Sequence, residues 1–238
     1  MVGIVGGWWL LGRLQKKYPL QNLDKTARDD LIFWAVIGII LGGRLGYVFI
    51  YQPAYFIQRP LEIFQLWQGG MAFHGGMLGF IAALYLFAKK RDINFLALTD
   101  RIACVVPLGL FFGRIANFIN GELYGRITDA PIGMVFPGGG PLARHPSQLY
   151  QAGMEGLATG IILWGLLLFT KVEKTPGRLS GMFLICYGIS RMIGETFRQP
   201  DAQIGFLFGG ATMGQLLSLP MVLIGIGLYA YSARNKTT

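Results

Sequence analysis

Charge is scarce in this sequence of 238 residues: 14% are Asp, Glu, Lys or Arg, 53% are apolar, and the mean hydropathy is +0.48. This composition excludes an ordinary soluble domain and is typical of a polytopic membrane protein. The two cysteines, Cys104 and Cys186, both lie in apolar runs, so we expect no disulfide. The HExxH, CxxC and GxSxG motifs, carboxylate clusters and internal repeats are also missing, so we expect no metal site, no cofactor and no serine-hydrolase chemistry.

Apolar runs that approach the length needed to cross a bilayer, about 20 residues, recur along the chain. They lie at residues 31–51, 71–88, 102–120, 149–170, 179–197 and 212–233. A shorter run at 1–12 has no basic region before it, so we interpret it as the inner part of a first span rather than a signal peptide. The predicted fold is an all-α integral membrane protein of seven transmembrane helices, the first one incomplete. We expect one polytopic domain over 1–238, with a small loop-rich cap at 121–147 between the fourth and fifth helices.

Basic residues are divided unequally between the two sides of these spans. Fourteen lie on one side, and four lie on the other, namely Arg59, Arg126, Arg144 and Arg198. By the positive-inside rule the first side is cytoplasmic, which places the C-terminus inside and the cap outside. The net charge of +9 is then explained by contact with anionic lipid, so membrane lipid is an expected partner and nucleic acid is not.

Three expected spans each retain an arginine, although a charged side chain at bilayer depth costs at least about 2.5–3.5 kcal/mol. Each arginine belongs to a stripe at helical spacing: Arg44, Tyr47 and Tyr51; Arg114, Asn117 and Gly121; Tyr187, Arg191, Glu195 and Arg198. Guanidinium groups that converge in a low-dielectric cavity repel one another unless an anion lies between them, and their planar forks suit a phosphate diester. We therefore predict a phospholipid head-group site. Alternatively, an arginine snorkels to the interface or pairs with a carboxylate, as Glu195 could do for Arg191.

His74 lies in QGGMAFHGGMLG, where neighbouring glycines leave the imidazole accessible. A lone histidine commonly has a structural role, but its place at the outer end of the expected third span favours acid–base chemistry. We interpret Ser147, in RHPSQLYQ, as the N-cap of the fifth span rather than as a nucleophile.

Four segments resemble characteristic blocks of bacterial phosphatidylglycerol:prolipoprotein diacylglyceryl transferases, in the same order. They are GGMAFHGGMLG, GRIANFINGELYGR, RHPSQLYQ and RMIGETFRQPDAQ. The resemblance runs from about residue 34 to 229. It implies that the sn-1,2-diacylglyceryl group of phosphatidylglycerol is transferred to the thiol of a lipobox cysteine in a prolipoprotein signal peptide, with release of glycerol phosphate. It also implies a multi-pass protein of the bacterial inner membrane, with its N-terminus and active site facing the periplasm.

The resemblance further implies which residues form the site. The essential histidine of the family falls on His74, and its two essential arginines fall on Arg114 and Arg191. Together with the stripes, it gives the expected substrate-binding residues, which are Arg44, Tyr47, Asn117, Glu122, Gly125, Tyr187, Glu195 and Arg198. Family members usually begin with an outer amphipathic arm and a tyrosine in an HWYG-like motif, and this sequence begins after it. We therefore expect an incomplete or late-assigned start.

The chemistry of these residue types suggests their roles. We expect His74 to accept the thiol proton, and Arg114 and Arg191 to stabilise charge on the leaving phosphate. We expect Asn117 and Glu122 to orient these groups. An arginine-rich cavity would itself favour the thiolate, which leaves open a positioning role for His74. The alternative function is a lipid or anion transporter, for which internal repeats and interrupted helices would be expected; a non-catalytic scaffold explains the arginines poorly.

Overall fold

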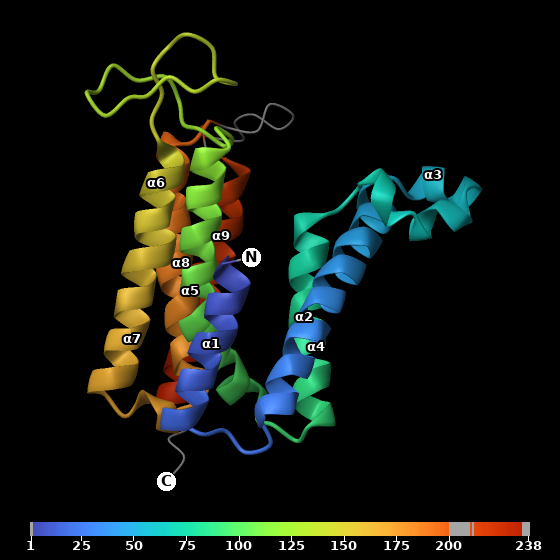
Figure 1. Cartoon of the computed structure of the whole chain (residues 1–238), viewed down its shortest axis with the longest axis vertical. Helices are drawn as coiled ribbons and strands as arrows, with labels where there is room; N and C mark the ends of the chain where they lie inside the picture. Colours follow the sequence, from blue (N-terminus) through green and yellow to red (C-terminus); the bar gives the residue numbers. More distant parts are fainter. Residues whose placement is uncertain (1, 200–209, 211, 235–238) are drawn as a thin grey trace. The chain divides into compact units, whose positions relative to one another are not determined.

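The computed structural model describes residues 2–199, 210 and 212–234, and the regular elements in this part of the chain are helices (Figure 1). The longer helices are α1 (Val2–Lys17), α2 (Lys25–Gly46), α4 (Phe73–Lys90), α5 (Phe95–Ile119), α7 (Thr159–Phe169), α8 (Arg178–Phe197) and α9 (Met213–Arg234). The shorter ones are α3 (Pro53–Gln58), α6 (Ser147–Gln151), two π-helices, η1 (Tyr47–Tyr51) and η4 (Ala152–Ala158), and the 3-10 helices Pro60–Phe64, Leu66–Gln68 and Val172–Lys174. The predicted all-α class is confirmed.

Within the described residues, four helical stretches are long and apolar enough to cross a membrane. They are Lys25–Tyr51, Phe95–Ile119, Ser147–Phe169 and Met213–Arg234. The expected spans at 71–88 and 179–197 form α4 and α8, and the run at 1–12 forms α1, but none of these belongs to that set. Two lysines end α4 and an arginine–glutamate stripe runs along α8, which lowers the hydropathy of both helices. The protein is therefore an all-helical integral membrane protein, and the total of seven spans stays a prediction.

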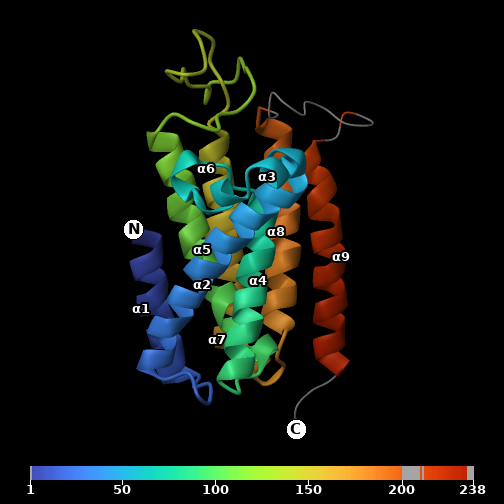
Figure 2. The ribbon, with the colours of Figure 1, turned by 90° about the vertical axis from the view of Figure 1, so that its right-hand side faces the viewer.

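The chain divides into two compact units, and unit 2 comprises residues 15–98. Here α2 packs along α4, as both views show (Figure 2). A Cβ on Gly46 would lie 2.8 Å from Gly75 Cα, and a Cβ on Gly79 would lie 2.8 Å from Gly42 Cα. The two helix backbones thus touch, which is the close packing that small residues permit in membranes.

Unit 1 comprises the described residues of 1–14 and 99–238, in which α5, α7, α8 and α9 run side by side (Figures 1 and 2). A Cβ on Gly181 of α8 would lie 2.8 Å from Gly225 O of α9, so these helices also pack closely. A Cβ on Gly156 of η4 would lie 2.8 Å from Phe111 Cα of α5. This contact brings the next turn of α5 against η4, where the candidate site lies. The prediction of one polytopic domain over the whole chain stays a prediction.

A loop between α5 and α6 covers one end of unit 1, in the region of the expected cap. Its backbone is held by hydrogen bonds from Thr128 N to Ala143 O at 2.9 Å and from Met134 N to Arg144 O at 2.9 Å. The prediction that Ser147 caps the following helix is wrong, because Pro146 is the N-cap and Ser147 is already helical. Its hydroxyl donates to Leu123 O at 3.0 Å, since this loop carbonyl is within reach and needs a donor.

Candidate functional site

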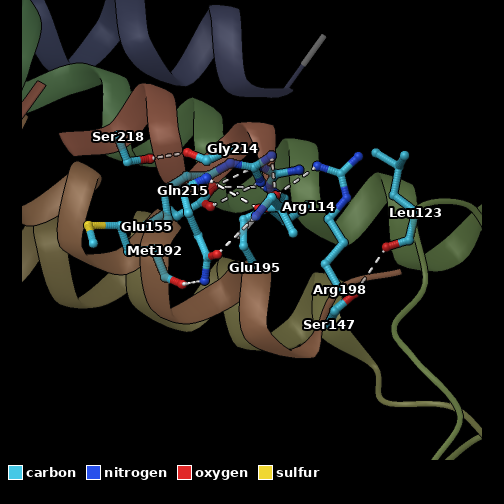
Figure 3. A network of polar contacts seen from close by, with 12 residues as sticks. Arg114, Leu123, Ser147, Glu155, Met192, Glu195, Arg198, Gly214, Gln215 and Ser218 are labelled. Carbon is cyan, nitrogen blue, oxygen red and sulfur yellow. Dashed lines mark hydrogen bonds and ion pairs between the residues drawn. The ribbon is translucent and has the colours of Figure 1, made fainter. Parts of the chain in front are cut away.

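A buried carboxylate, Glu155, lies at the centre of the polar residues of unit 1 (Figure 3). Arg114 on α5 donates from Nε and Nη2 to Glu155 Oε2 at 3.0 and 2.9 Å. Arg191 on α8 places Nη1 3.7 Å from Glu155 Oε1. Glu155 is carried by the π-helix η4, a form of turn that is frequent at functional sites. Two arginines from different helices therefore meet on one carboxylate.

Glu155 is not among the residues that the sequence patterns predicted, although the sequence contains a signal for it. It is the only charged residue in the run 149–170, as Arg114 is in its own span. A lone ionisable residue at bilayer depth is by itself a functional candidate. A search for intramembrane charges of both signs would have found it.

A second carboxylate, Glu195, joins the same group of residues. Arg191 Nη2 lies 2.6 Å from Glu195 Oε1, one turn apart on α8, which is the pairing that the sequence left open as an alternative to ligand binding by Arg191. Arg198 Nη1 lies 3.3 Å from the same oxygen, and Thr212 Oγ1 donates to Oε2 at 2.9 Å. A Cβ on Gly214 would lie 2.6 Å from Glu195 Cδ, so the glycine leaves room for this carboxylate.

We call Arg114, Glu155, Arg191, Glu195 and Arg198 the arginine–glutamate cluster. Its three guanidinium groups face two carboxylates, which leaves an excess of positive charge. The expectation that converging arginines require an anion between them is met within the protein, because the Glu155 carboxylate takes that place. The arginine side chains are 12–16% exposed, so they remain accessible to a ligand.

The cluster also contains polar atoms whose bonding is incomplete. Arg191 Nη1 and Glu155 Oε1 are buried and form no hydrogen bond in the described structure, since 3.7 Å between them is too long for one. The same holds for both amide atoms of Gln151 and for Gln148 Oε1, one and two helical turns before Glu155. Buried polar groups are normally hydrogen-bonded, so each of these atoms needs a partner that the described protein contacts do not supply.

The predicted residues of the segment GRIANFINGELYGR form the junction between α5 and the loop. Asn117 O accepts from Glu122 N at 3.0 Å, and the exposed side chain of Glu122 accepts from Asn120 Nδ2 at 3.2 Å. Next to the cluster, the backbone carbonyl of Glu122 accepts a hydrogen bond from Gln148 Nε2 at 2.7 Å. Asn117 and Glu122 therefore shape the loop, and their expected orienting role stays a prediction.

Gly125 has a steric reason to be glycine. A Cβ there would lie 2.6 Å from His145 Cβ and 2.6 Å from Phe197 O, which no side chain tolerates. Its N–H donates to His145 O at 2.9 Å. The next residue, Arg126, donates from Nε to Arg198 O at 3.0 Å and from Nη2 to Glu195 O at 3.2 Å. This pair of residues therefore fastens the loop to the end of α8 that carries the cluster.

Tyr187 lies on α8 one turn before Arg191, where its ring stacks on Phe183 with the centroids 5.7 Å apart. It is within electrostatic range of Glu155 and of all three arginines of the cluster. The structure thus brings together Arg114, Tyr187, Arg191, Glu195 and Arg198, as the two stripes in this unit predicted.

The remaining predicted residues, Arg44, Tyr47 and His74, belong to unit 2. The Arg44 guanidinium donates to the carbonyl oxygens of Glu62, Ile63 and Gly69, at 2.5, 2.8 and 2.5 Å. Arg44 therefore fixes the segment that leads into α4, where His74 is the second residue. Its donors point at protein carbonyls, so the geometry favours a positioning role.

Tyr47 supports the same segment from the other side. Its ring stacks on Tyr51, with the centroids 5.9 Å apart, and meets Phe56 edge-on at 6.2 Å. A Cβ on Gly70, whose φ is +80°, would lie 2.5 Å from Tyr47 Cε1. The aromatic ring and the glycine are thus mutually required, and the substrate-binding role of Tyr47 stays a prediction.

Comparison with known proteins gives a consistent result. Residues 1–231 match the family model described as prolipoprotein diacylglyceryl transferase. The chain is 52% identical over 236 residues to phosphatidylglycerol–prolipoprotein diacylglyceryl transferase of Paramagnetospirillum magneticum, covering 99% of this chain and 87% of the relative. It is 53% identical over 237 residues to the enzyme of that name from Rhodospirillum rubrum, covering 99% and 86%. For that of Rhodopseudomonas palustris the identity is 53% over 232 residues, covering 95% and 81%.

Proposed function

The chain belongs to the prolipoprotein diacylglyceryl transferase family, and we propose that its arginine–glutamate cluster binds the phosphate of phosphatidylglycerol during the transfer. The protein is a transferase that moves the diacylglyceryl group of phosphatidylglycerol to a prolipoprotein. The acceptor is the thiol of the lipobox cysteine. The observation that carries this proposal is the meeting of Arg114 and Arg191 on Glu155, where Arg191 Nη1 lies in ion-pair range of the carboxylate but forms no hydrogen bond in the described structure.

Electrostatics support a phosphate ligand at this place. The cluster has more guanidinium groups than carboxylates, and hydrogen bonds from arginine to phosphate are short and strong. Glu155 lowers the mutual repulsion of Arg114 and Arg191, so both can remain charged before the lipid arrives. A phosphate diester that approaches Arg191 would accept a hydrogen bond from its Nη1, which forms none in the described structure.

The reaction needs a nucleophile and a stabilised leaving group. The cysteine thiolate attacks the sn-3 carbon of the diacylglyceryl group, the carbon–sulfur bond forms, and the carbon–oxygen bond to phosphate breaks with its electron pair on oxygen. Arg114 and Arg191 stabilise this developing charge. His74 takes the thiol proton; this assignment is supported by the family resemblance and by the chemistry of imidazole. The products are a thioether and glycerol phosphate.

The protein is a multi-pass membrane protein. Its expected orientation in the bacterial inner membrane follows from the distribution of basic residues, with a cytoplasmic C-terminus and an active site facing the periplasm. Phosphatidylglycerol in the outer leaflet then reaches the site laterally. A seven-helix arrangement, in which α1 contributes to the first helix, agrees with that orientation.

The deciding experiment is a transfer assay with purified full-length protein. Phosphatidylglycerol labelled in its acyl chains is incubated with a peptide that contains a lipobox cysteine. We expect label on the peptide and unlabelled glycerol phosphate in solution. A peptide with serine in place of cysteine is the matched control and should stay unlabelled, whereas equal labelling of both peptides would contradict thiol transfer.

A further inference from the structure

A row of buried side chains next to the arginine–glutamate cluster has unused hydrogen-bonding capacity. Gln148, Gln151 and Glu155 lie at i, i+3 and i+7 along α6 and η4, and all three are inaccessible to solvent. Gln148 Oε1, both amide atoms of Gln151 and Glu155 Oε1 form no hydrogen bond in the described structure. Such groups are costly when unsatisfied, so a row of them requires a partner that completes it.

The amide of Gln148 is held in one orientation. Its Nε2 donates to Glu122 O at 2.7 Å, so Oε1 is left as a fixed acceptor. The preceding Ser147 donates to Leu123 O at 3.0 Å and fixes the start of the same helix. Gln148 therefore offers an acceptor whose direction is set before a ligand arrives.

Gln151 differs because neither of its amide atoms is used by the protein. A Cβ on Gly194 would lie 3.1 Å from Gln151 Cγ and 3.3 Å from its Nε2, so the amide lies against α8. Gly194 is one turn beyond Arg191, whose Nη1 also forms no hydrogen bond in the described structure. Gln151 thus offers a donor and an acceptor together, beside the arginine that is proposed to bind phosphate.

We infer that Gln148 and Gln151 bind the hydroxyl groups of the glycerol head group of phosphatidylglycerol. The inference rests on the proposed phosphate-binding role of the cluster and deepens it. A hydroxyl donates and accepts at once, which matches the acceptor of Gln148 and the donor and acceptor of Gln151. An ammonium head group would fit less well, because it only donates and could not use the amide donor of Gln151, and because the three arginines of the cluster outnumber its two carboxylates. Head-group selection therefore comes from amides, and phosphate binding comes from arginines.

The test compares two lipids that differ only in the hydroxyl groups. Phosphatidylglycerol and phosphatidylpropanol share the phosphate diester, and the second lacks head-group hydroxyls. With full-length wild-type protein in detergent and a lipobox peptide, we expect kcat/KM for phosphatidylglycerol to be higher by roughly 10-fold or more. In Gln151→Met we expect kcat/KM for phosphatidylglycerol to fall by about 3–10-fold, because one neutral hydrogen bond is lost. We expect kcat/KM for phosphatidylpropanol to stay unchanged.

Gln151→Met is informative because it removes no hydrogen bond within the described protein. The lipid-free variant should unfold at the same temperature as wild type or at a higher one, since an unsatisfied buried amide is lost. Gln215→Met is the matched control. Gln215 Nε2 donates to Met192 O at 3.3 Å and Oε1 accepts from Thr212 N at 3.1 Å, so its loss should lower the unfolding temperature and affect both lipids equally.

Three results would overturn the inference: equal use of the two lipids by wild type, an unchanged preference in Gln151→Met, or a lower unfolding temperature of that lipid-free variant. The third would mean that the amide has a structural partner such as water. If Gln151→Met does not fold, Gln151→Asn shortens the reach of the same amide and should show the same loss of preference. Failure of the proposed function looks different, because wild type would then transfer nothing from phosphatidylglycerol.

Discussion

Two arginine environments illustrate opposite uses of the same side chain. In unit 2, Arg44 is 4% exposed and directs its guanidinium at the backbone carbonyls of Glu62, Ile63 and Gly69. In unit 1, Arg191 forms ion pairs with the carboxylates of Glu155 and Glu195, and its Nη1 forms no hydrogen bond in the described structure. The first arrangement shapes the polypeptide, and the second is prepared for a ligand. An intramembrane arginine is thus a functional candidate whose partners decide its role.

Glycine has two uses in these units. In unit 2, Gly42, Gly46, Gly75 and Gly79 bring two helix backbones into contact, and in unit 1 Gly181 does the same for α8 and α9. In unit 1, Gly156 also lets η4 approach α5, and Gly214 leaves room for the carboxylate of Glu195. Close packing therefore serves helix association in both units and, in unit 1, the assembly of a polar cluster as well.

The largest effect on the rate of transfer is expected from a change at His74, which follows the segment that Arg44 holds in place. If His74 accepts the thiol proton, His74→Asn should lower transfer by about 10²–10⁴-fold, the range for a lost general base. Raising the pH should partly restore it, because above the ordinary thiol pKa of about 8.5 the solvent supplies thiolate. Transfer rates across pH, together with lipid binding by the variant, measure this. If the variant stays slow at every pH, the wild-type His74 has a positioning role. If the variant has wild-type rates at neutral pH, His74 takes no part in the mechanism.

Arg114 and Arg191 should show the next largest effect. Arg114→Lys and Arg191→Lys keep the charge but lose the planar fork, so we expect transfer to fall by about 10²–10³-fold, as when one preorganised donor is lost at a transition state. Steady-state rates with saturating peptide check this. Arg126→Lys is the control, since Arg126 donates to the backbone carbonyls of Arg198 and Glu195 and we propose no phosphate-binding role for it. Full activity of either cluster variant would mean that its arginine does not bind phosphate.

Arg44→Lys sharpens the comparison, because its main effect should be on stability. A lysine cannot reach the same set of carbonyl oxygens, and the groups left unsatisfied should lower the free energy of unfolding by about 1–3 kcal/mol. Thermal unfolding in detergent measures this, with the corresponding Arg191→Lys variant alongside. We expect transfer by folded Arg44→Lys to fall less than transfer by Arg191→Lys. The reverse order would make Arg44 a ligand-binding residue and erase the distinction between the two environments.

The smallest effect is expected from a topology test that leaves activity intact. Single cysteines at Lys90 in unit 2 and Lys174 in unit 1 should both be shielded from an impermeant reagent added outside, while one at Asp129 should be labelled. The variants are made in a background without Cys104 and Cys186. Labelling at Lys90 and Lys174 with protection at Asp129 would reverse the orientation and remove the periplasmic assignment.

Much of this protein was predictable from its sequence because a bilayer imposes strong rules on composition. The scarcity of charge indicated the membrane class, and helical spacing left open, as an alternative, the pairing of Arg191 with Glu195, whose atoms lie 2.6 Å apart in the structure. Local periodicity fixes such neighbours, since residues four apart lie on one face of a helix. The segment GRIANFINGELYGR, with the three other resembling segments, likewise indicated the family whose model matches the chain.

Other features depended on contacts between distant segments. The carbonyls that bind Arg44 lie 18–26 residues away, and the carboxylate that binds Arg114 lies 41 residues away. Ser147 follows the sequence pattern of an N-cap, but its hydroxyl donates a hydrogen bond to the loop carbonyl of Leu123 instead. No spacing rule could reveal these partners, because hydrogen bonds between separate helices form only once packing has placed them together.

The sequence by itself therefore determined the class, the helices and the family, since hydropathy and helical period are local properties. Only the tertiary structure decided which charges are neutralised inside the protein and which polar atoms remain unsatisfied. Gly156 lets η4 touch α5, and that contact joins Arg114 to Glu155. The same packing buries Gln148 and Gln151 without completing their hydrogen bonds. The physical reason is that burial and hydrogen bonding depend on three-dimensional neighbours, which a linear pattern does not specify.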